Sequence, residues 1–363
     1  MLDSPDDLRQ QREHKRALFR RDEAQAWQLF ERAPCVRFAC VLADGTPLLR
    51  AFTAVVVDGR LCFHGADAGE KLELVGRRAV ASTDEVVAQI SSHWIHPELA
   101  CPASTYFISA LVEGHVQLVE DLERRARILR TMMERFQPEG GYAPIAVDDR
   151  RYRKVIEHLF VAELVPERVS AKFRLGQHRS RSQIESVLAG LWQRGGASDM
   201  RAIRAIKEAH PESPRPDFLR GPAGTELCVA PDADDARAVA ALLDDQYWTR
   251  EFSPSVMAAA QLGSQAWVVA RDPDGVPIGS ARAVTDGARF GWIMDVVVHP
   301  GWRARGVGQA LTQLLLDHPR LRSLAYIGLR TRDAHAVYAK FGFVSEPGSE
   351  VQMGLRRAAS RAP

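Results

Sequence analysis

A stretch dense in proline and glycine, HPESPRPDFLRGPAG at residues 210–224, separates two halves of the chain with different hydrophobic patterning. It lacks periodicity, and its proline and glycine residues interrupt helices and strands, so we interpret it as a linker. Short strands at close spacing dominate before it, whereas strands and helices alternate after it. A chain of 363 residues is long enough for two or three domains. The sequence therefore predicts two domains and a connecting extension, with boundaries at residues 1–180, 181–222 and 223–363.

The first half is rich in predicted strands from Val36 to about Val119. RFACVLADGTPLLRAFTAVVVDGRLCFHGA, residues 37–66, holds three or four short strands with turns at Asp44-Gly45 and Asp58-Gly59. Hairpins that follow one another so closely favour a barrel. Helices are expected over residues 8–32, 121–136 and 181–209, and a further strand over residues 158–175.

The second half contains a glycine-rich turn, HPGWRARGVGQAL at residues 299–311. It follows the β-branched run WIMDVVVHP, and the residues after it recur at helical spacing until Pro319. The first turn of a helix has unpaired N–H groups and the positive end of the helix dipole, and glycines let an anion approach the backbone. Arg303 and Arg305 add positive charge. This turn therefore predicts a phosphate-bearing ligand.

Two motifs of the second half resemble those of a known family. Arg303-Ala304-Arg305-Gly306-Val307-Gly308 fits the pattern Gln/Arg-x-x-Gly-x-Gly/Ala, and TRDAHAVYAKFGF at residues 331–343 is similar to a helix with a tyrosine and a Gly-Phe ending. On these motifs, residues 225–355 resemble the GNAT family of acyl-CoA-dependent N-acetyltransferases. The implied fold class is an α/β (α+β) GNAT domain that follows a β-rich first domain.

The resemblance implies that acetyl-CoA is the co-substrate and a small-molecule amine the acceptor. The residues that would bind the coenzyme are Val296, Val297 and Val298 along the strand, Arg303, Ala304, Arg305, Gly306, Val307, Gly308 and Gln309 at the turn, and Asp333. Asp333 stands where the family often has asparagine, and it suits a helix N-cap. Tyr338 would protonate the departing thiolate, although an aromatic packed under the last helix fits the same pattern.

The general base and the acceptor site are less constrained. Asp295 in the central strand is a candidate base or amine anchor, and equally a structural hydrogen-bond acceptor, while Asp333 and His335 remain further candidates. In DDQYWTREFSP, residues 244–254, Tyr247 and Trp248 would form an apolar wall for the acceptor or pack in the core. The same alternatives hold for Thr285 and Asp286.

The first half resembles a second family through four stretches. They are DGRLCFHGADAGEKLELV (58–75), ACPASTYFISALVEGHVQLVED (100–121), QPEGGYAPI (137–145) and VSAKFRLGQHRS (169–180). On these stretches, residues 22–180 look like the pyridoxamine-phosphate-oxidase-like, flavin-binding split barrels. Arg174 and Gly176 depart from the Lys and Ser of the pattern Lys-x-Lys-Leu-Ser-Gln-Asn.

This resemblance implies a split barrel with helices that binds flavin mononucleotide (FMN) at the interface of a homodimer. Arg50 and Lys71 would hold the phosphate, and the residues at the ring would be Phe52, Thr53, Phe63, His64 and Gly65. Lys172 and Gln177 would serve the neighbouring subunit. Alternatively, Lys71 is a solvated helix residue and His64 a hydrogen-bonded turn residue. Haem held by His64 is a less favoured reading.

Composition narrows the remaining classes. A net charge of +2 gives no reason to expect nucleic acid or an anionic membrane as partner, and no apolar run approaches the roughly 20 residues that span a bilayer. The first residues have no apolar core of a secretion signal. Five cysteines without close pairing suggest free thiols in the cytoplasm and no metal site. Two functions remain open: a small-amine acetyltransferase with the barrel as redox or dimerisation module, or a sensor or detoxification protein in which acetyl transfer is the output.

Overall fold

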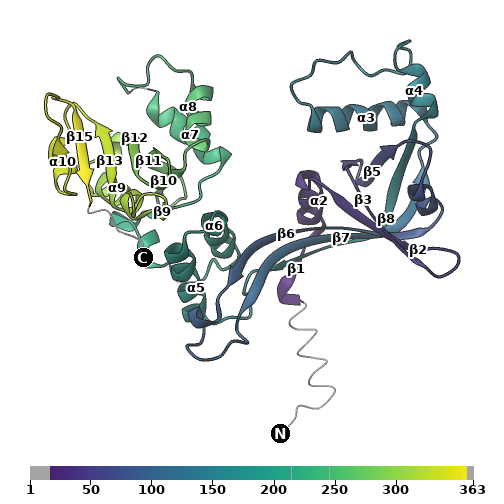
Figure 1. The fold of residues 1–363 in the computed structure, drawn as a ribbon, viewed down its shortest axis with the longest axis horizontal. Coiled ribbons are helices and arrows are strands. Elements are labelled where there is room, and N and C mark those ends of the chain that lie inside the picture. The colour runs from purple at the N-terminus through teal and green to yellow at the C-terminus, as the bar shows by residue number, and fades with distance from the viewer. Residues whose placement is uncertain (1–16, 214, 245, 358–363) are drawn as a thin grey trace, which may run out of the picture. The chain divides into compact units, whose positions relative to one another are not determined.

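The computed structural model describes residues 17–213, 215–244 and 246–357, which form two compact units (Figure 1). The first unit holds residues up to 86 together with 105–178, and the second holds 87–104 together with the residues from 179 onward. The predicted extension 181–222 therefore belongs to the second unit. No helix among the described residues has the length and apolar character needed to cross a membrane.

The first unit is built on one sheet in the order β3-β2-β6-β7-β8-β5-β4, with β1 paired to β8. Its strands are β1 (Arg20–Arg21), β2 (Val36–Val41), β3 (Pro47–Phe52), β4 (Ala54–Val57), β5 (Arg60–Gly65), β6 (Arg78–Ile90), β7 (Ser104–Leu118) and β8 (Phe160–Arg174). Buried and more exposed residues alternate along β2 and β7, as in strands with one face on a core. The turn predicted at Asp58-Gly59 joins β4 to β5, and both residues have the positive φ that a two-residue hairpin turn requires.

The helices of this unit are α2 (Glu23–Arg32), α3 (Leu122–Phe136) and α4 (Arg153–His158), with a 3-10 turn η1 (Glu70–Leu74). The helix predicted over 121–136 is confirmed, and Asp121 caps its first turn through Arg124 N. The helix predicted over 8–32 is wrong in its extent. Asp22 caps a helix that begins at Glu23, and Arg20 and Arg21 pair with β8 instead. Residues 8–16 lie outside the described part of the chain.

The second unit contains a mixed sheet in the order β14-β15-β13-β12-β11-β10-β9. The strands are β9 (Glu226–Cys228), β10 (Ala266–Arg271), β11 (Pro277–Thr285), β12 (Phe290–Val298), β13 (Tyr326–Arg330), β14 (Val344–Ser345) and β15 (Gln352–Arg356). The helices are α5 (Arg181–Arg194), α6 (Asp199–Ala209), α7 (Ala233–Leu243), α8 (Pro254–Leu262), α9 (Val307–Asp317) and α10 (His335–Ala339). The single helix predicted over 181–209 is two helices, because Gly195 takes the left-handed conformation at the end of α5.

The middle of this sheet opens between two strands. β12 and β13 run parallel but pair only over Phe290–Trp292 and Tyr326–Gly328. On its other side β12 pairs with β11 up to Val298, with a register shift between Ser280 and Arg282. Opposite this shift, Asp295 has a φ of 51°. The second half of β12 therefore continues along β11 while leaving β13.

Candidate functional site

The predicted phosphate turn connects β12 to α9. A 3-10 turn, η5 (Pro300–Trp302), follows the strand, and Ala304 and Gly306 then take φ values of 59° and 82°. Gly306 is the N-cap of α9 and offers no side chain to bond the first N–H groups of the helix. These N–H groups are therefore available to an anion at the positive end of the helix dipole.

The two arginines of the turn are held by local contacts. Nε of Arg303 donates to the carbonyl of Val298 at 3.1 Å. The guanidinium of Arg305 lies 5.0 Å from the ring centroid of Trp302. Both arginines are exposed, so positive charge is fixed beside the start of α9 without being buried.

The backbone of β12 leads from this turn into the opening of the sheet. Val297 has its side chain in the core under α7, with 4% exposed, and Val296 lines the opening. Beyond Trp292, no described strand pairs with the β13 side of β12. The backbone groups on that side are consequently free to bond an extended ligand.

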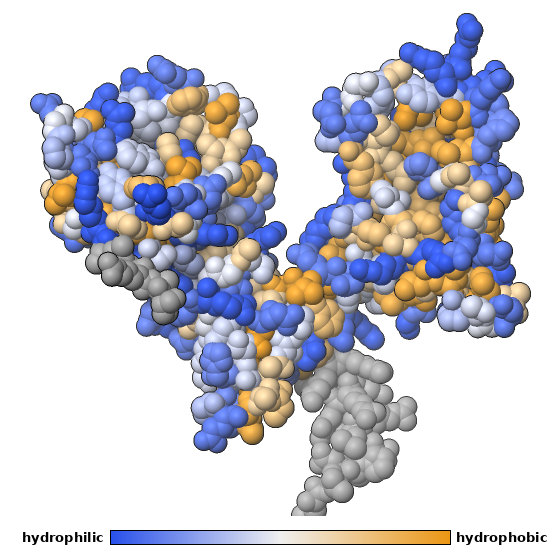
Figure 2. Space-filling view, viewed as in Figure 1, coloured by the Kyte–Doolittle hydropathy of each residue, from blue (hydrophilic) through white to orange (hydrophobic). Residues whose placement is uncertain are grey.

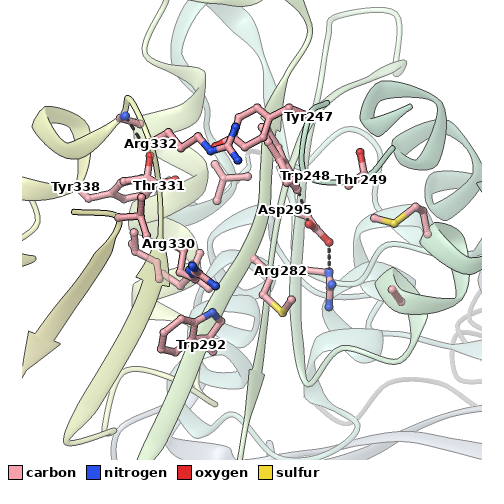
Figure 3. A pocket seen from close by; sticks show the side chains of 18 of the residues that line it. Tyr247, Trp248, Thr249, Arg282, Trp292, Asp295, Arg330, Thr331, Arg332 and Tyr338 are labelled. Atoms are coloured by element: carbon pink, nitrogen blue, oxygen red, sulfur yellow. Dashed lines mark hydrogen bonds and ion pairs between the residues drawn. The ribbon is translucent and has the colours of Figure 1, made fainter. Parts of the chain in front are cut away.

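A cavity of about 700 Å³ fills the opening (Figure 3). Its walls come from the loop after α7, from α8, from the middle strands and from the segment between β13 and α10. The lining residues are Tyr247, Trp248, Thr249, Phe252, Val256, Met257, Ala260, Arg282, Trp292, Ile293, Met294, Asp295, Val296, Leu329, Arg330, Thr331, Arg332, Asp333, Ala334, Tyr338 and Val351. The structure thus brings together six predicted site residues from three separate segments of the chain: Tyr247 and Trp248, Asp295 and Val296, and Asp333 and Tyr338.

Asp295 lies in the wall with both carboxylate oxygens engaged. Nε of Arg282 donates to Oδ2 at 2.6 Å, and Nε1 of Trp248 donates to Oδ1 at 3.2 Å (Figure 3). The side chains of Arg282 and Asp295 are only 9% and 7% exposed. This buried ion pair and the bond from Trp248 occupy both oxygens of Asp295 and hold the indole of Trp248 in place.

Tyr247 and Trp248 form a wall of the cavity and are not part of the core. Their rings meet edge to face with centroids 4.9 Å apart, and they are 40% and 38% exposed. The guanidinium of Arg332 lies 4.2 Å from the Tyr247 centroid. The loop after α7 and the segment after β13 therefore meet across the cavity.

Tyr338 projects from α10 into the opposite wall and is 8% exposed. Its ring also packs edge to face against Phe343, so the catalytic and the packing interpretations both have structural support. Burial, assisted by the negative charges of Asp333 and Tyr247, raises the pKa of Tyr338 to about 12. The hydroxyl is therefore protonated at neutral pH.

The prediction that Asp333 caps α10 is wrong. The residue before the helix is Ala334, and its N–H donates to Oγ1 of Thr331 at 3.0 Å. Asp333 instead lines the cavity, whereas Nε2 of His335 contacts the carbonyl of Glu350 outside it.

Thr285 and Asp286 are turn residues. The Asp286 carboxylate accepts from the N–H groups of residues 288, 289 and 290, which lowers the pKa of Asp286. Thr285 Oγ1 donates to the carbonyl of Phe290 at 2.7 Å. Neither residue lines the cavity.

In the first unit, the two predicted phosphate partners meet at η1. Arg50 on β3 forms an ion pair with Glu70, with Nε and Oε2 2.5 Å apart, and Lys71 is the next residue. Nζ of Lys71 donates to the carbonyl of Ala68. A Cβ at Gly65 would lie 2.8 Å from Cε of Lys71. The absence of a side chain at Gly65 therefore makes room for the side chain of Lys71. Two cations and one carboxylate therefore gather beside the end of β5.

The residues predicted to line a flavin ring differ in how far their side chains are exposed to solvent. Thr53 and His64 are exposed, and partial shielding by neighbouring atoms lowers the pKa of His64. Phe52 is half-buried and stacks on Phe63, with centroids 4.7 Å apart. Phe63 is fully buried, which corrects the prediction that it lines a bound ring.

Lys172 and Gln177 lie far from Lys71 within one chain. Gly65 pairs with Phe160 at the start of β8, whereas Lys172 pairs with Ser109 near its end. At ~3.3 Å per residue, the intervening strand is about 40 Å long. Gln177 bonds the backbone of Leu175 and Phe173. These residues do not complete the Lys71 site of their own chain.

Family models match the two units to two different families. The model of the pyridoxamine 5'-phosphate oxidase family matches residues 22–173, and that of the GNAT acetyltransferase family matches residues 234–343. The first unit is a pyridoxamine 5'-phosphate oxidase-family domain, and the second contains a GNAT domain.

Curated relatives match only a short part of this chain. Proteins described as "uncharacterized N-acetyltransferase ycf52" from Pyropia yezoensis and Porphyra purpurea are 31% and 32% identical over 78 and 71 residues. These segments are 21% and 19% of this chain, which spans 45% and 41% of the relatives' lengths.

Two solved structures are also similar to parts of this chain. The flavocytochrome Anf3 from Azotobacter vinelandii is 20% identical, with 44% of this chain and 70% of that chain covered and a TM-score of 0.37. A putative GNAT acetyltransferase from Xanthomonas campestris pv. campestris is 28% identical, with 34% and 87% covered and a TM-score of 0.30.

Sequence reasoning missed several residues of the GNAT cavity. Arg282, Trp292, Arg330 and Arg332 line it, and none was predicted to do so. A signal existed for Arg282, since an arginine in the apolar run VPIGSARAV must find a partner if the strand is buried. Arg330 and Arg332 follow the strand LAYIGLR without any local feature that marks them.

Proposed function

We propose that the GNAT domain transfers the acetyl group of acetyl-CoA to the amine of a small molecule. One observation carries this proposal. The cavity with Tyr338 is lined by Val296 of β12, the free edge of β12 continues from there, and the turn after β12 leads to the uncapped start of α9. A phosphate-bearing arm with a reactive end matches the order of these features.

In this proposal the coenzyme pyrophosphate binds the N–H groups of residues 304–309, with Arg303 and Arg305 beside it. The left-handed conformation of Gly306 keeps a side chain away from that position. The pantetheine arm follows the backbone of Val296–Val298, and the thioester reaches the cavity between Tyr338 and Asp333.

The acceptor attacks as a neutral amine. A C–N bond forms at the thioester carbonyl, the C–S bond breaks, and the amine proton passes to water in the open cavity. A free thiol has a pKa of ~8.5, so a tyrosine whose pKa is about 12 does not give up its proton outright to the thiolate. Tyr338 therefore acts as a hydrogen-bond donor that stabilises the departing sulfur.

Asp295 contributes position in this scheme. Its oxygens already accept from Arg282 and Trp248, which supports an anchoring role over that of a free base. Holding Trp248 in place keeps one wall of the acceptor site rigid.

The test of coenzyme binding is a pair of glycine variants in the full chain. Gly306→Asp places a carboxylate where the pyrophosphate would lie, whereas Gly275→Asp makes the same change in a turn outside the site. The two glycines have similar φ values, 82° and 84°, so their backbone strain is matched. Calorimetry should show acetyl-CoA binding to Gly275→Asp and a loss of at least tenfold in affinity for Gly306→Asp. Equal affinity in both variants would contradict the proposed site.

A second proposal concerns the first unit: it binds FMN as a homodimer. Arg50 and Lys71 against the single carboxylate of Glu70 fit a phosphate, whereas buried Phe63 does not fit the ring. A bound flavin supplies hydride and single-electron transfer. The distance of Lys172 and Gln177 from Lys71 is consistent with contacts to a neighbouring subunit. Apolar surface on the first unit, seen as orange in Figure 2, favours association, and its exposed apolar residues include Val41, Leu49 and Phe136.

Titration of the full chain with FMN and with riboflavin tests this second proposal. Lys71→Gln should weaken FMN binding at least tenfold and leave riboflavin binding nearly unchanged, because only FMN has the phosphate. Lys340→Gln, in the other unit, is the matched control. Light scattering should give a dimer.

The five free cysteines support a reducing compartment, and we propose the cytoplasm.

A further inference from the structure

The charges that line the GNAT cavity do not balance. Arg282 and Asp295 neutralise each other in their buried ion pair. The remaining charged side chains are Arg330, Arg332 and Asp333. Among the residues that the structure describes, no carboxylate forms an ion pair with Arg330 or Arg332. With Asp333 as the only other charged residue in this lining outside that pair, Arg330 and Arg332 give the cavity an excess of positive charge.

Arg332 is held in place without being neutralised. Its guanidinium lies 4.2 Å from the centroid of the Tyr247 ring, across the cavity (Figure 3). Such a cation–π contact orders the guanidinium through its face and leaves the N–H groups on its edge available. An ordered guanidinium with free N–H donors is suited to bidentate binding of a carboxylate.

Arg330 projects from the face of β13 that carries the ring of Trp292. Trp292 pairs with Gly328, and a Cβ at Gly328 would lie 2.3 Å from Cζ3 of the indole, so the ring lies directly over this glycine. Arg330 is two residues further along and points to the same face. A second guanidinium is thereby placed beside an aromatic surface.

The rest of the wall is apolar. Trp248, Phe252, Val256, Met257 and Met294 line the cavity together with Trp292. Such a wall removes an apolar body from water, whereas a charged group placed on it would lose its hydration without compensation.

We infer that the acceptor is an amine with an apolar body and a carboxylate, as in a large apolar amino acid, and that Arg330 and Arg332 bind the carboxylate. This inference rests on the proposed acetyl transfer and names its substrate class. The two arginines are specificity-determining residues, because they distinguish a carboxylate from a neutral group of the same size.

The test uses the full-length protein with saturating acetyl-CoA and measures thiol release. Phenylalanine and leucine are each compared with their amides and with the decarboxylated amines, so that body size is constant while the carboxylate is lost. We expect kcat/KM for the amino acids to exceed that for the neutral amines by about tenfold or more, the range of a charge-assisted hydrogen bond.

Arg330→Gln and Arg332→Gln should reduce this ratio of kcat/KM values towards one. A ratio is insensitive to a uniform loss of active protein. Arg289→Gln is the matched control, since Arg289 also stacks on an aromatic ring, Phe290, at 4.8 Å but lies outside the cavity. It should keep the wild-type ratio.

Other outcomes separate the two levels of the argument. Neutral amines that react as well as the amino acids, or a ratio that survives in both arginine variants, would overturn the inference and leave acetyl transfer standing. If the variants instead weaken acetyl-CoA binding equally with every acceptor, the arginines serve the coenzyme and the inference fails. If no amine accelerates thiol release, the proposed transfer fails as well.

Discussion

Breaking the ion pair between Arg282 and Asp295 should destabilise the GNAT domain strongly. The two side chains are 9% and 7% exposed, so water and salt screen them little, and they are 2.6 Å apart. Arg282→Met keeps the length of the side chain and removes its charge. It leaves the Asp295 carboxylate with Trp248 as its remaining hydrogen-bond donor among the described residues. Removing one partner of a buried pair costs ~3–5 kcal/mol, and we expect a loss in this range.

The double variant decides whether the pair is the cause. Asp295 has a φ of 51°, which asparagine tolerates well, so Asp295→Asn removes the charge with little backbone strain. Arg282→Met/Asp295→Asn contains no uncompensated buried charge. It should therefore cost less than the sum of the single variants, by about 0.5–3 kcal/mol.

Hydrogen exchange of peptides from β10, β11 and β12 measures these free energies within one unit. Arg237→Met is the control, because Arg237 and its partner Asp234 are 69% and 82% exposed, and exposed pairs contribute ~0–1 kcal/mol. A cost below 1 kcal/mol for Arg282→Met, or strict additivity in the double variant, would refute the reasoning.

Two further predictions concern titratable groups of the same domain. Tyr338→Phe keeps the ring packed on Phe343 but removes the hydroxyl. The value of kcat should therefore fall by about 10²–10³-fold, while the affinity for acetyl-CoA is retained. An unchanged kcat with a lower melting temperature would make Tyr338 a packing residue only. His318 is 3% exposed, and burial together with Arg320 and Arg322 lowers the pKa of His318 to about 4. The unfolded chain binds this proton below pH 6.5 and the folded one does not, so stability should be lost as the pH falls from 6.5 towards 4. Thermal unfolding of His318→Asn should depend less on pH in that range, and a dependence equal to that of the wild type would contradict the assignment.

The turn between β12 and α9 could be predicted from sequence because its conformation depends on neighbouring residues. Arg303, Arg305 and Gly306 are neighbours in the chain, and the positive φ of Gly306 follows from the residue type that the turn needs. Asp121 likewise marks the start of α3. The family models support both domain assignments.

The cavity could not be predicted in the same way, since its contacts join distant segments. Tyr247 and Arg332 lie in different loops, and their contact depends on how α7 and β13 are placed on the sheet. Phe63 shows the reverse error. It is near the predicted flavin residues in sequence, yet Leu61, Cys62 and Phe63 are all buried, so both faces of this part of β5 are covered.

Asp295 shows how one residue links the fold to the site. In the apolar run WIMDVVV it is the only charged residue, and a regular strand would be expected to exclude it. The register shift at Ser280 and Arg282 brings Arg282 to Asp295, and the positive φ of Asp295 belongs to the same irregularity. Aspartate adopts that backbone conformation more readily than the β-branched residues around it. The carboxylate is thus compatible with the bend, is neutralised by Arg282 and accepts a hydrogen bond from Trp248 in the wall of the cavity. A single substitution at this position should therefore disturb the strand, the ion pair and the cavity wall together.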